Sequence, residues 1–361
     1  MQRVTRPAGL HLAYVSRADY KSAQWADVLG IATFNGTPAP ANPAAGLPIA
    51  EVRMPVLRGG AHLYEVWSSG ERARSGQRSR VHFRHTEEML FGCITLAESD
   101  VGPNGGDAER TPPASALEEV TAHIYGEVCA TLDAEGYPHL VRIWNYLPDI
   151  NGDCQGTERY RLFNAARQHG LNAFGRALAG SVPAASALGA ISNSPVVVYF
   201  LAARTAPVFV ENPRQVSAYH YPRQYGAHRP VFSRAALLTQ ADRRTLFISG
   251  TASIVGHESL HVGDCAAQTR ETLANIEALL QEANRVARDA HFDFGSLAYK
   301  VYVRHPDNLP VVQSALAAAL GPDVQTIYLQ ADICRPELLV EIEATGICPL
   351  ARSAPAPAAR C

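Results

Sequence analysis

The feature that most constrains this sequence is that landmarks of its first half recur in its second half at a fixed spacing. Gly92 follows the apolar run MLF, and Gly250 follows LFIS 158 positions later. A Pro-Asp pair that ends a strand-like run occurs at Pro148-Asp149 and recurs, again 158 positions later, at Pro306-Asp307. A constant spacing between two pairs of landmarks indicates an internal duplication. We therefore expect two related halves in one chain.

The predicted elements follow a similar order in both halves. Strands are expected at 64–67, 81–85, 89–96, 140–146, 195–201, 245–253, 297–303, 328–331 and 338–343, and helices at 115–132, 158–171, 264–290 and 309–320. Residues 70–80 read as a polar, cationic turn. This order predicts an α+β fold of two β-β-α-β-α-β halves, with mixed sheets, helices on one face, and a cleft between the halves. We expect an N-terminal extension (1–60), the two halves (61–205 and 206–347) and a disordered tail (348–361).

Composition excludes several classes of protein. The net charge of −2 and the pI of about 6.7 favour neither nucleic acid nor an acidic membrane surface as a partner. No segment approaches the roughly 18 apolar residues of a membrane span. The seven cysteines are odd in number and lack CxxC spacing, which argues against a disulfide framework or zinc site and fits a reducing cytoplasm. The histidines at 257 and 261 stand among glycines, so no metal site is expected.

Two glutamates interrupt the apolar strand predicted at 338–343. Because side chains alternate along a strand, Leu338, Val340 and Ile342 point one way and Glu341 and Glu343 point the other. Two interpretations are open. Both carboxylates line a solvated sheet face, or Glu341 sits in a pocket where desolvation raises its pKa, so that it can deliver a proton.

Cationic and phenolic residues gather where the halves join. Tyr219, Tyr221 and Arg223 alternate, so an extended backbone would project all three from one face, where they could bind a carboxylate. The alternative is a linker whose tyrosines pack on the surface. Arg142 lies within the apolar run LVRIWNY and Arg304 follows YKVYV, at nearly matching places. A buried arginine needs an anionic partner, and we favour a structural partner for Arg142 and a ligand for Arg304.

Two further positions carry weaker signals. The small residues of SGTAS, which include Gly250, allow close approach of a ligand to the backbone, but no phosphate-binding pattern follows. Cys334 has no neighbouring base to mark it as a nucleophile. It is better interpreted as a small residue of a pocket wall, seven positions before Glu341.

Longer motifs resemble known families. SRAALL, LFISGTASIVG, CAAQTRETLANIEALL and RPELLVEIEA, within 212–345, resemble the YjgF/RidA superfamily of small trimeric α+β proteins. WNYLPDING, ERYRLFNAARQHG, NPRQVSAYHYPRQYG and YLQADICRPELLVEIEA, within about 60–345, resemble the chorismatases, which join two RidA-like halves in one chain.

The chorismatase resemblance implies cleavage of chorismate to 3-hydroxybenzoate and pyruvate, without a metal or redox cofactor. It implies that Glu341 protonates the enolpyruvyl group. The expected grips for the two substrate carboxylates are Arg142, Arg223, Arg304, Tyr219 and Tyr221. A glycine and a cysteine in the pocket mark the aromatising subfamily, and they map to Gly250 and Cys334. Formation of some 4-hydroxybenzoate, or hydrolysis to a dihydroxycyclohexadiene carboxylate, remains an alternative.

The RidA resemblance leaves other classes of function open. The arginine with which RidA proteins hold an imino acid falls at Gln325, and its absence argues against an imine deaminase. A non-catalytic protein that binds small metabolites, or a scaffold in an aromatic-polyketide pathway, remains an alternative. Chorismate is the expected partner, and both a monomer and a homotrimer are compatible with the duplication.

Overall fold

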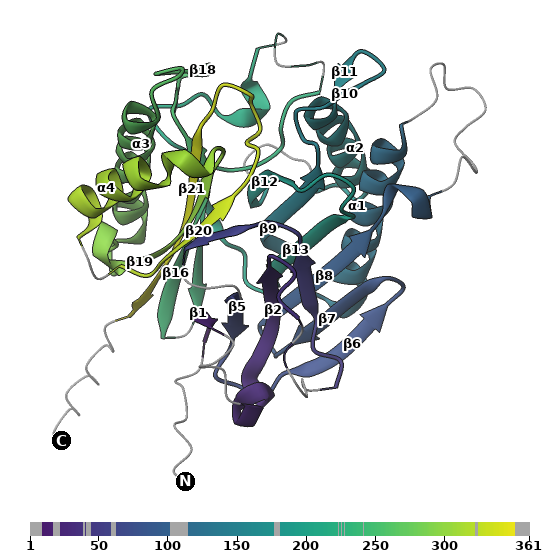
Figure 1. The fold of residues 1–361 in the computed structure, drawn as a ribbon. Coiled ribbons are helices and arrows are strands. Elements are labelled where there is room, and N and C mark those ends of the chain that lie inside the picture. Colours follow the sequence, from purple (N-terminus) through teal and green to yellow (C-terminus); the bar gives the residue numbers. More distant parts are fainter. Residues whose placement is uncertain are drawn as a thin grey trace, which may run out of the picture.

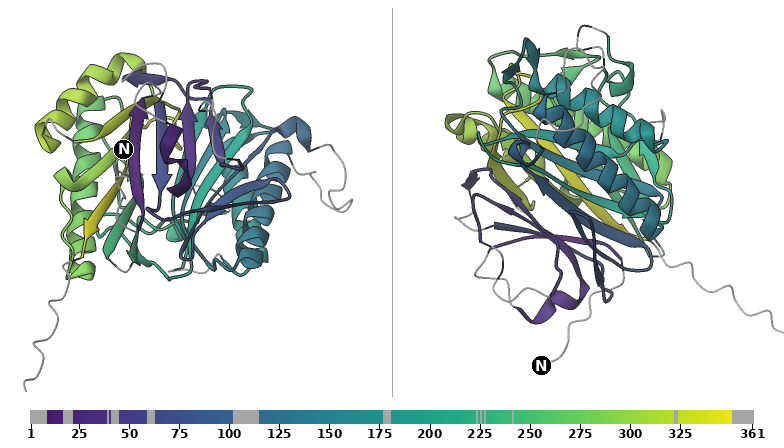
Figure 2. Two further views of the ribbon diagram at one scale, coloured as in Figure 1. Left: turned by 90° about the horizontal axis from the view of Figure 1, so that it is seen from below. Right: turned by 90° about the vertical axis from the view of Figure 1, so that its right-hand side faces the viewer.

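The computed structural model consists of two helix-covered sheets and a smaller N-terminal sheet (Figure 1). It describes the chain except for residues 1–8, 17–21, 39, 41–44, 59–62, 102–114, 177–180, 223, 225, 227, 241, 322–323 and 351–361. The helices lie on the two outer sides and the N-terminal strands lie between the two halves, as the left view of Figure 2 shows, and the right view shows these strands at one end of the halves. The predicted position Arg223 and residues 351–361 of the predicted tail fall outside the described residues, whereas residues 348 and 349, predicted as disordered tail, belong to the last strand of the second half.

The first half forms a six-stranded sheet in the order β12-β9-β13-β8-β7-β6. Its strands are β6 (Arg74–Arg78), β7 (Val81–His85), β8 (Met89–Leu96), β9 (His139–Pro148), β12 (Ala184–Ala190) and β13 (Val196–Ala203). Its helices are α1 (Ala116–Glu135) and α2 (Arg159–Ala173), and β10 (Asp153–Cys154) and β11 (Thr157–Glu158) form a short hairpin before α2.

The second half forms a seven-stranded sheet in the order β14-β15-β16-β21-β19-β20-β4. Its strands are β14 (Val208–Val210), β15 (Ala235–Gln240), β16 (Arg243–Ala252), β19 (Leu297–Val303), β20 (Thr326–Gln330), β21 (Val340–Pro349) and, from the N-terminal region, β4 (Val56–Arg58). Its helices are α3 (Cys265–Ala287) and α4 (Leu309–Leu320), and β17 (Ile254–Val255) pairs with β18 (Glu258–Ser259).

The two sheets repeat one topology. β12-β9-β13-β8-β7-β6 corresponds strand for strand to β20-β19-β21-β16-β15-β14, and the parallel pair β12/β9 corresponds to the parallel pair β20/β19. The predicted α+β class, with mixed sheets and helices on one face, is confirmed. Several strands were not expected from the sequence: β6 and β12 in the first sheet, and β4, β14 and β15 in the second.

Two segments near the N-terminus differ from expectation. The turn predicted at 70–80 contains a strand, β6, whose exposed arginines pair through their backbone with β7. β5 (Leu63–Ser68) joins β1 (His11–Ser16), β2 (Val28–Phe34) and β3 (Ile49–Val52) in the N-terminal sheet rather than the sheet of the first half. Among the described residues, none of the helices is long and apolar enough to cross a membrane.

Local signals explain where the long helices begin and end. Ser115 caps α1 by accepting a hydrogen bond from the Glu118 amide, while the Glu118 carboxylate accepts one from the Ser115 amide. α1 ends at Gly136, which adopts a left-handed conformation with φ of 73°. Asp264 caps α3 by accepting from the Ala267 amide, as the sequence predicts.

Three apolar clusters follow from this layering. One lies between α1, α2 and the outer face of the first sheet, and another lies between α3, α4 and the outer face of the second. The third is shared by the inner faces of all three sheets, with Trp67 from the N-terminal sheet, Trp144 and Tyr199 from the first half, and Phe247 and Tyr302 from the second. The inner faces are therefore a common interior, which is where side chains from all three sheets meet.

Close contact between the sheets makes Gly30 on β2 sensitive to substitution. A Cβ at Gly30 would lie 2.0 Å from the Phe91 ring, whereas a Cβ at Gly126, within α1, would meet no atom within 4 Å. We expect Gly30→Ala to lower the free energy of unfolding by about 1–3 kcal/mol, since the N-terminal sheet must shift. Gly126→Ala should raise it by about 0.5–1 kcal/mol. Urea unfolding measures both; equal effects would contradict tight packing at Gly30.

Candidate active site

Glu341 and Glu343 lie on β21 and face the common interior. Val340 and Ile342 point to the helix-covered side, so the predicted alternation is confirmed within β21. For Leu338 the prediction is wrong, because this residue precedes β21 and packs in the common interior. The side chains of Glu341 and Glu343 are buried, with 4 % and 5 % of their surface exposed. The interpretation of a solvated sheet face is therefore wrong, since burying a carboxyl group is costly unless it is paired or protonated.

A β-bulge opens the sheet beside Glu341. β16 and β21 pair in regular register up to Ile248, and the register shifts between Ile248 and Thr251. Across the same boundary the first half has continuous pairing between β8 and β13. The shift places Gly250 against the carboxyl group, because a Cβ at position 250 would lie 2.0 Å from Glu341 Oε1. Bulges commonly re-aim side chains at functional sites, and this one makes room for the acid.

A pocket of about 200 Å³ lies next to Glu341, between the start of α2 and the second half. Its described lining consists of Glu158, Tyr160, Arg161, Tyr221, Pro230, Phe232, Arg234, Gly250, Ala252, Ile254, Cys334, Arg335, Pro336, Glu337 and Glu341. Apolar side chains thus surround one buried carboxyl group and several cations.

Burial sets the protonation state of Glu341. Desolvation is the main cause that raises the pKa of its carboxyl group, the neighbouring charge of Glu343 adds to the rise, and Arg142, Arg234 and Arg304 oppose it, so that the pKa is about 8. No hydrogen bond from a described residue reaches the carboxyl group. At neutral pH, Glu341 is therefore a protonated acid.

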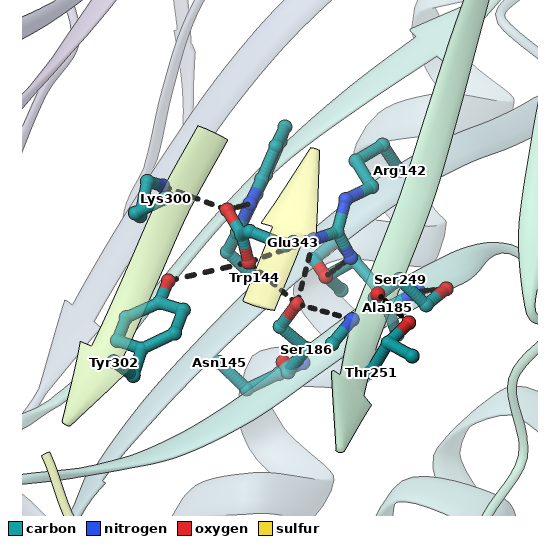
Figure 3. Close-up of polar contacts among 12 residues, drawn as sticks. Arg142, Trp144, Asn145, Ala185, Ser186, Ser249, Thr251, Lys300, Tyr302 and Glu343 are labelled. Atoms are coloured by element: carbon teal, nitrogen blue, oxygen red, sulfur yellow. Dashed lines mark hydrogen bonds and ion pairs between the residues drawn. The ribbon is translucent and has the colours of Figure 1, made fainter. Parts of the chain in front are cut away.

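Glu343 is ionised instead, because cations and hydrogen-bond donors converge on it (Figure 3). Its oxygens accept hydrogen bonds from Trp144 Nε1 at 2.7 Å, Ser186 Oγ at 2.6 Å and Arg142 at 2.9 Å, and Lys300 Nζ lies 2.9 Å away. Burial raises the pKa of this carboxyl group, but Lys300 and Arg142 outweigh burial and bring the pKa below its ordinary value. Two glutamates on one strand face thus hold opposite protonation states.

The predicted arginines Arg142 and Arg304 are both held by the protein's own carboxylates. Arg142, 1 % exposed, pairs with Glu343 and donates to Ser186 Oγ at 2.6 Å. Arg304 pairs with Asp332 at 2.6 Å and donates to the carbonyl oxygens of Leu338 and Arg335. Neither is among the described lining residues of the pocket. The residue that matches Arg142 at the spacing of the duplication is Lys300, rather than Arg304.

Of the predicted phenols, Tyr221 reaches the pocket and Tyr219 is not among its described lining residues. The segment is not extended, because Tyr219 lies within a short 3₁₀ helix, η3 (Ala218–His220), and Tyr221 follows it as the C-cap. Tyr219 packs against the apolar cluster of the first half, with its ring 4.7 Å from that of His220. Tyr221 is buried, and its hydroxyl accepts a hydrogen bond from Arg234 at 2.7 Å.

Arg234 is a pocket cation that the sequence analysis did not single out. It is 4 % exposed and donates to the carbonyl oxygen of Val216 and to Tyr221, two neutral acceptors. Its Nε is buried without a hydrogen-bond partner. No described carboxylate lies within ion-pair distance of its guanidinium; the Glu211 carboxyl group interacts with the guanidinium charge at longer range. A buried guanidinium in this state favours an anionic ligand. In the sequence, Arg234 could have been found as the single charged residue of the otherwise uncharged segment SRAALL, just before β15.

Cys334 and Gly250 lie on the pocket wall, beside Glu341. Burial and the nearby Glu341 raise the pKa of the Cys334 thiol to about 12, so it stays protonated and is a poor nucleophile. Within the described part of the chain, no group of three or more histidine, cysteine, aspartate or glutamate residues could hold a metal ion.

Comparisons with known proteins agree with this geometry. Residues 65–202 match the family model described as chorismatase FkbO/Hyg5-like, N-terminal. A 3-hydroxybenzoate synthase of Streptomyces hygroscopicus is 36 % identical over 307 residues, which cover 82 % of this chain and 85 % of that protein. A chorismatase of Streptomyces rapamycinicus is 36 % identical over 286 residues, 77 % of this chain and 80 % of that protein. A chorismatase crystal structure matches with a TM-score of 0.81 at 30 % identity, over 94 % of this chain and 98 % of that one.

The raised pKa of Glu341 predicts a pH-dependent cost to stability. The pKa is raised from an ordinary 4.5 to about 8, so the folded state holds the proton longer and stability falls as the pH rises through this window. We expect Glu341→Gln to melt at nearly the wild-type temperature at pH 5 and clearly above it at pH 9. Thermal unfolding at both values tests this. Glu51→Gln, at an exposed carboxylate on β3, is the control. If the difference in melting temperature between Glu341→Gln and the wild type does not grow with pH, Glu341 titrates normally.

Proposed function

The chain belongs to the chorismatase family, and on that premise we propose that it converts chorismate to 3-hydroxybenzoate and pyruvate. The observation that carries the proposal is the pairing, within one pocket, of a protonated carboxylic acid with a buried guanidinium that has no carboxylate partner among the described residues. Chorismate offers the two complementary groups, an enol ether that accepts a proton and carboxylates that accept a cation.

Glu341 acts as the general acid in this proposal. It delivers its proton to the methylene carbon of the enolpyruvyl group, which becomes an oxocarbenium centre. The ether bond to the ring then breaks as pyruvate leaves, assisted by the neighbouring ring hydroxyl. The oxygen of that hydroxyl bonds to the ring carbon that the ether oxygen leaves, which gives a protonated arene oxide. The bond from this oxygen to its original carbon then opens, and loss of the proton from the ring carbon that now bears the oxygen gives 3-hydroxybenzoate and restores Glu341 to its starting state. No net water is consumed.

The pocket supports this route because the part of its wall near Glu341 is largely apolar. Phe232, Ala252 and Ile254 present apolar surface, and the neutral thiol of Cys334 adds little polarity. A dry wall stabilises the protonated acid before the reaction and removes the water that would divert the cation to a diol. Gly250 contributes by leaving the space that the Glu341 carboxyl group occupies.

Arg234 and Arg335 are the proposed grips for the substrate carboxylates, in place of Arg142 and Arg304, which are bound by Glu343 and Asp332. Arg234 forms a charge-assisted hydrogen bond with Tyr221, which orients both side chains. The Arg335 guanidinium lies 5.5 Å from the Tyr221 ring and is anchored by Ser259 Oγ at 3.0 Å. The two cations therefore flank one phenol at the pocket.

The first test is turnover of chorismate without added metal or nucleotide, followed by coupled detection of pyruvate. We expect Glu341→Gln to lower kcat by roughly 10²–10⁴-fold with the fold intact, the usual contribution of a general acid. Because the protonated form is active, wild-type kcat/KM should be level at neutral pH and fall above a pH of about 8.

Chromatography of the products completes this test. 3-Hydroxybenzoate in equal amount to pyruvate is the expected result. A dihydroxycyclohexadiene carboxylate would show that water reaches the cation. Absence of pyruvate, with chorismate still stabilising the protein against heat, would replace the enzyme with a binding protein.

Substituting Arg234 tests the carboxylate grip. Arg234→Met keeps the side-chain length and apolar packing but removes the charge, so KM for chorismate should rise by roughly ten- to a hundredfold, the loss of one charge-assisted hydrogen bond. Arg285→Met, on the exposed side of α3, is the matched control and should leave KM unchanged. An unchanged KM in Arg234→Met would assign the grip to another cation.

A further inference from the structure

A chain of buried charges links the N-terminal sheet to the pocket. Glu65 on β5 lies 2.5 Å from Lys300 Nζ on β19, and Lys300 lies 2.9 Å from Glu343 on β21. The exposed fractions of Glu65 and Lys300 are 0 % and 1 %. Each link joins a different strand, so three elements distant in sequence are connected through one lysine.

Glu65 is built into this position as an anion. Its Oε1 accepts hydrogen bonds from Trp67 Nε1 at 2.8 Å and from the Tyr199 hydroxyl at 3.1 Å, and Oε2 faces Lys300. Tyr199 in turn accepts a hydrogen bond from Lys300 at 2.9 Å. A carboxylate that faces a lysine and accepts from two donors is held ionised and fixed in place.

The other end of the chain reaches Glu341 by two routes. Glu343 is two residues from Glu341 on the same face of β21, so their charges interact directly. Ser186 on β12 provides the second route. Its hydroxyl donates to Glu343 at 2.6 Å and accepts from the Gly250 amide at 3.0 Å, which fixes the bulge against the acid.

The charges of this group balance. Two carboxylates, Glu65 and Glu343, face two cations, Arg142 and Lys300. Without Glu65, the two cations would share a single carboxylate, and the surplus positive charge would lie against Glu343, two residues from Glu341 on the same strand. A surplus cation in a poorly solvated interior favours the ionised form of a nearby acid.

We propose that Glu65 is a positioning residue of the reaction, through which the N-terminal sheet balances Lys300 and thereby keeps Glu341 protonated. This inference rests on the proposed role of Glu341 as the acid. It makes the N-terminal sheet part of the catalytic electrostatics, although no residue of that sheet is among the described lining of the pocket.

The remaining titratable groups around the charges are neutral phenols and a neutral thiol, the paired cations Arg142 and Arg304, the pocket residues Arg234 and Arg335, and the pocket carboxylates Glu158 and Glu337. Next to Glu65 and Lys300 are phenols that burial keeps protonated by raising the pKa of each: Tyr14, Tyr146, Tyr199 and Tyr302. Facing Glu341 are the cations Arg142, Arg234 and Arg304 and the neutral groups of Tyr160 and Cys334. Changing Glu65 or Lys300 leaves all of these in place.

Two substitutions with opposite signs test the proposal. Glu65→Gln should move the alkaline limit of kcat/KM to lower pH, and Lys300→Met should move it to higher pH, each by roughly one pH unit. Glu65→Gln/Lys300→Met together should return the limit close to the wild-type value. A purely structural role would lower activity in both single variants without shifting the limit in opposite directions. Glu65→Gln and the double variant suffice where Lys300→Met does not fold.

Glu51→Gln is the matched control, the same change at an exposed position of the same sheet, and should leave the limit unchanged. A readout independent of turnover is the infrared carboxyl band of Glu341, assigned by its loss in Glu341→Gln and titrated in each variant. Failure to release pyruvate with a band that still shifts would reject the chorismate reaction and keep this inference. If Glu65→Gln shifts neither the alkaline limit of kcat/KM nor the titration of the Glu341 carboxyl band, the proposed role of Glu65 is overturned.

Discussion

The site depends on two buried carboxyl groups that lie side by side, one of which is kept neutral by burial while the other stays charged. Glu341 and Glu343 are two residues apart on one strand face, and both are buried. Cations and donors are concentrated on Glu343, so it stays ionised, and its charge adds to the desolvation that keeps Glu341 protonated. The two states have different causes: Glu343 needs its cations and donors because an unpaired buried charge is costly, whereas burial is the main cause of the raised pKa of Glu341 and the repulsion from Glu343 adds to it.

Small residues determine where this pair can sit. β12 reads AASALGA, and its low volume lets the second half approach closely: the Ala185 amide donates to Ser249 Oγ at 2.9 Å, and a Cβ at Gly189 would lie 2.6 Å from Asp332. These contacts join the two halves at the bulge. The bulge then aims Glu341 into the pocket, so the acid depends on both halves although it belongs to one.

The sequence predicts the features that depend on local pattern. Alternation places Glu341 and Glu343 on one face, and the caps at Ser115 and Asp264 begin the helices where expected. It does not predict β12, because alanine and glycine carry no strand signal and their role is to permit contact with a distant segment. Lys300 and Glu65, like Arg142, are each a single charged residue in an apolar strand. The sequence marks each of them as a buried charge, but only the fold shows that they lie next to each other. Strand alternation also fails for Tyr219 and Tyr221, because Tyr219 lies in the 3₁₀ helix η3 and the two side chains do not share a face as they would on an extended backbone.

The duplication explains why one acid suffices. Tyr199 pairs with Trp144 across neighbouring strands of the first sheet, and Glu341 pairs with Tyr302 in the second. Trp144 and Tyr302 are 158 positions apart, the spacing of the duplication. Tyr199 therefore occupies the place in the first half that corresponds to Glu341 in the second. Its ring stacks 4.6 Å from Trp144, and its hydroxyl joins Glu65 and Lys300. The corresponding position of the first half is thus filled by an aromatic side chain. Because that side chain holds the charges that balance Glu343, the half without the acid helps to keep the acid of the other half protonated.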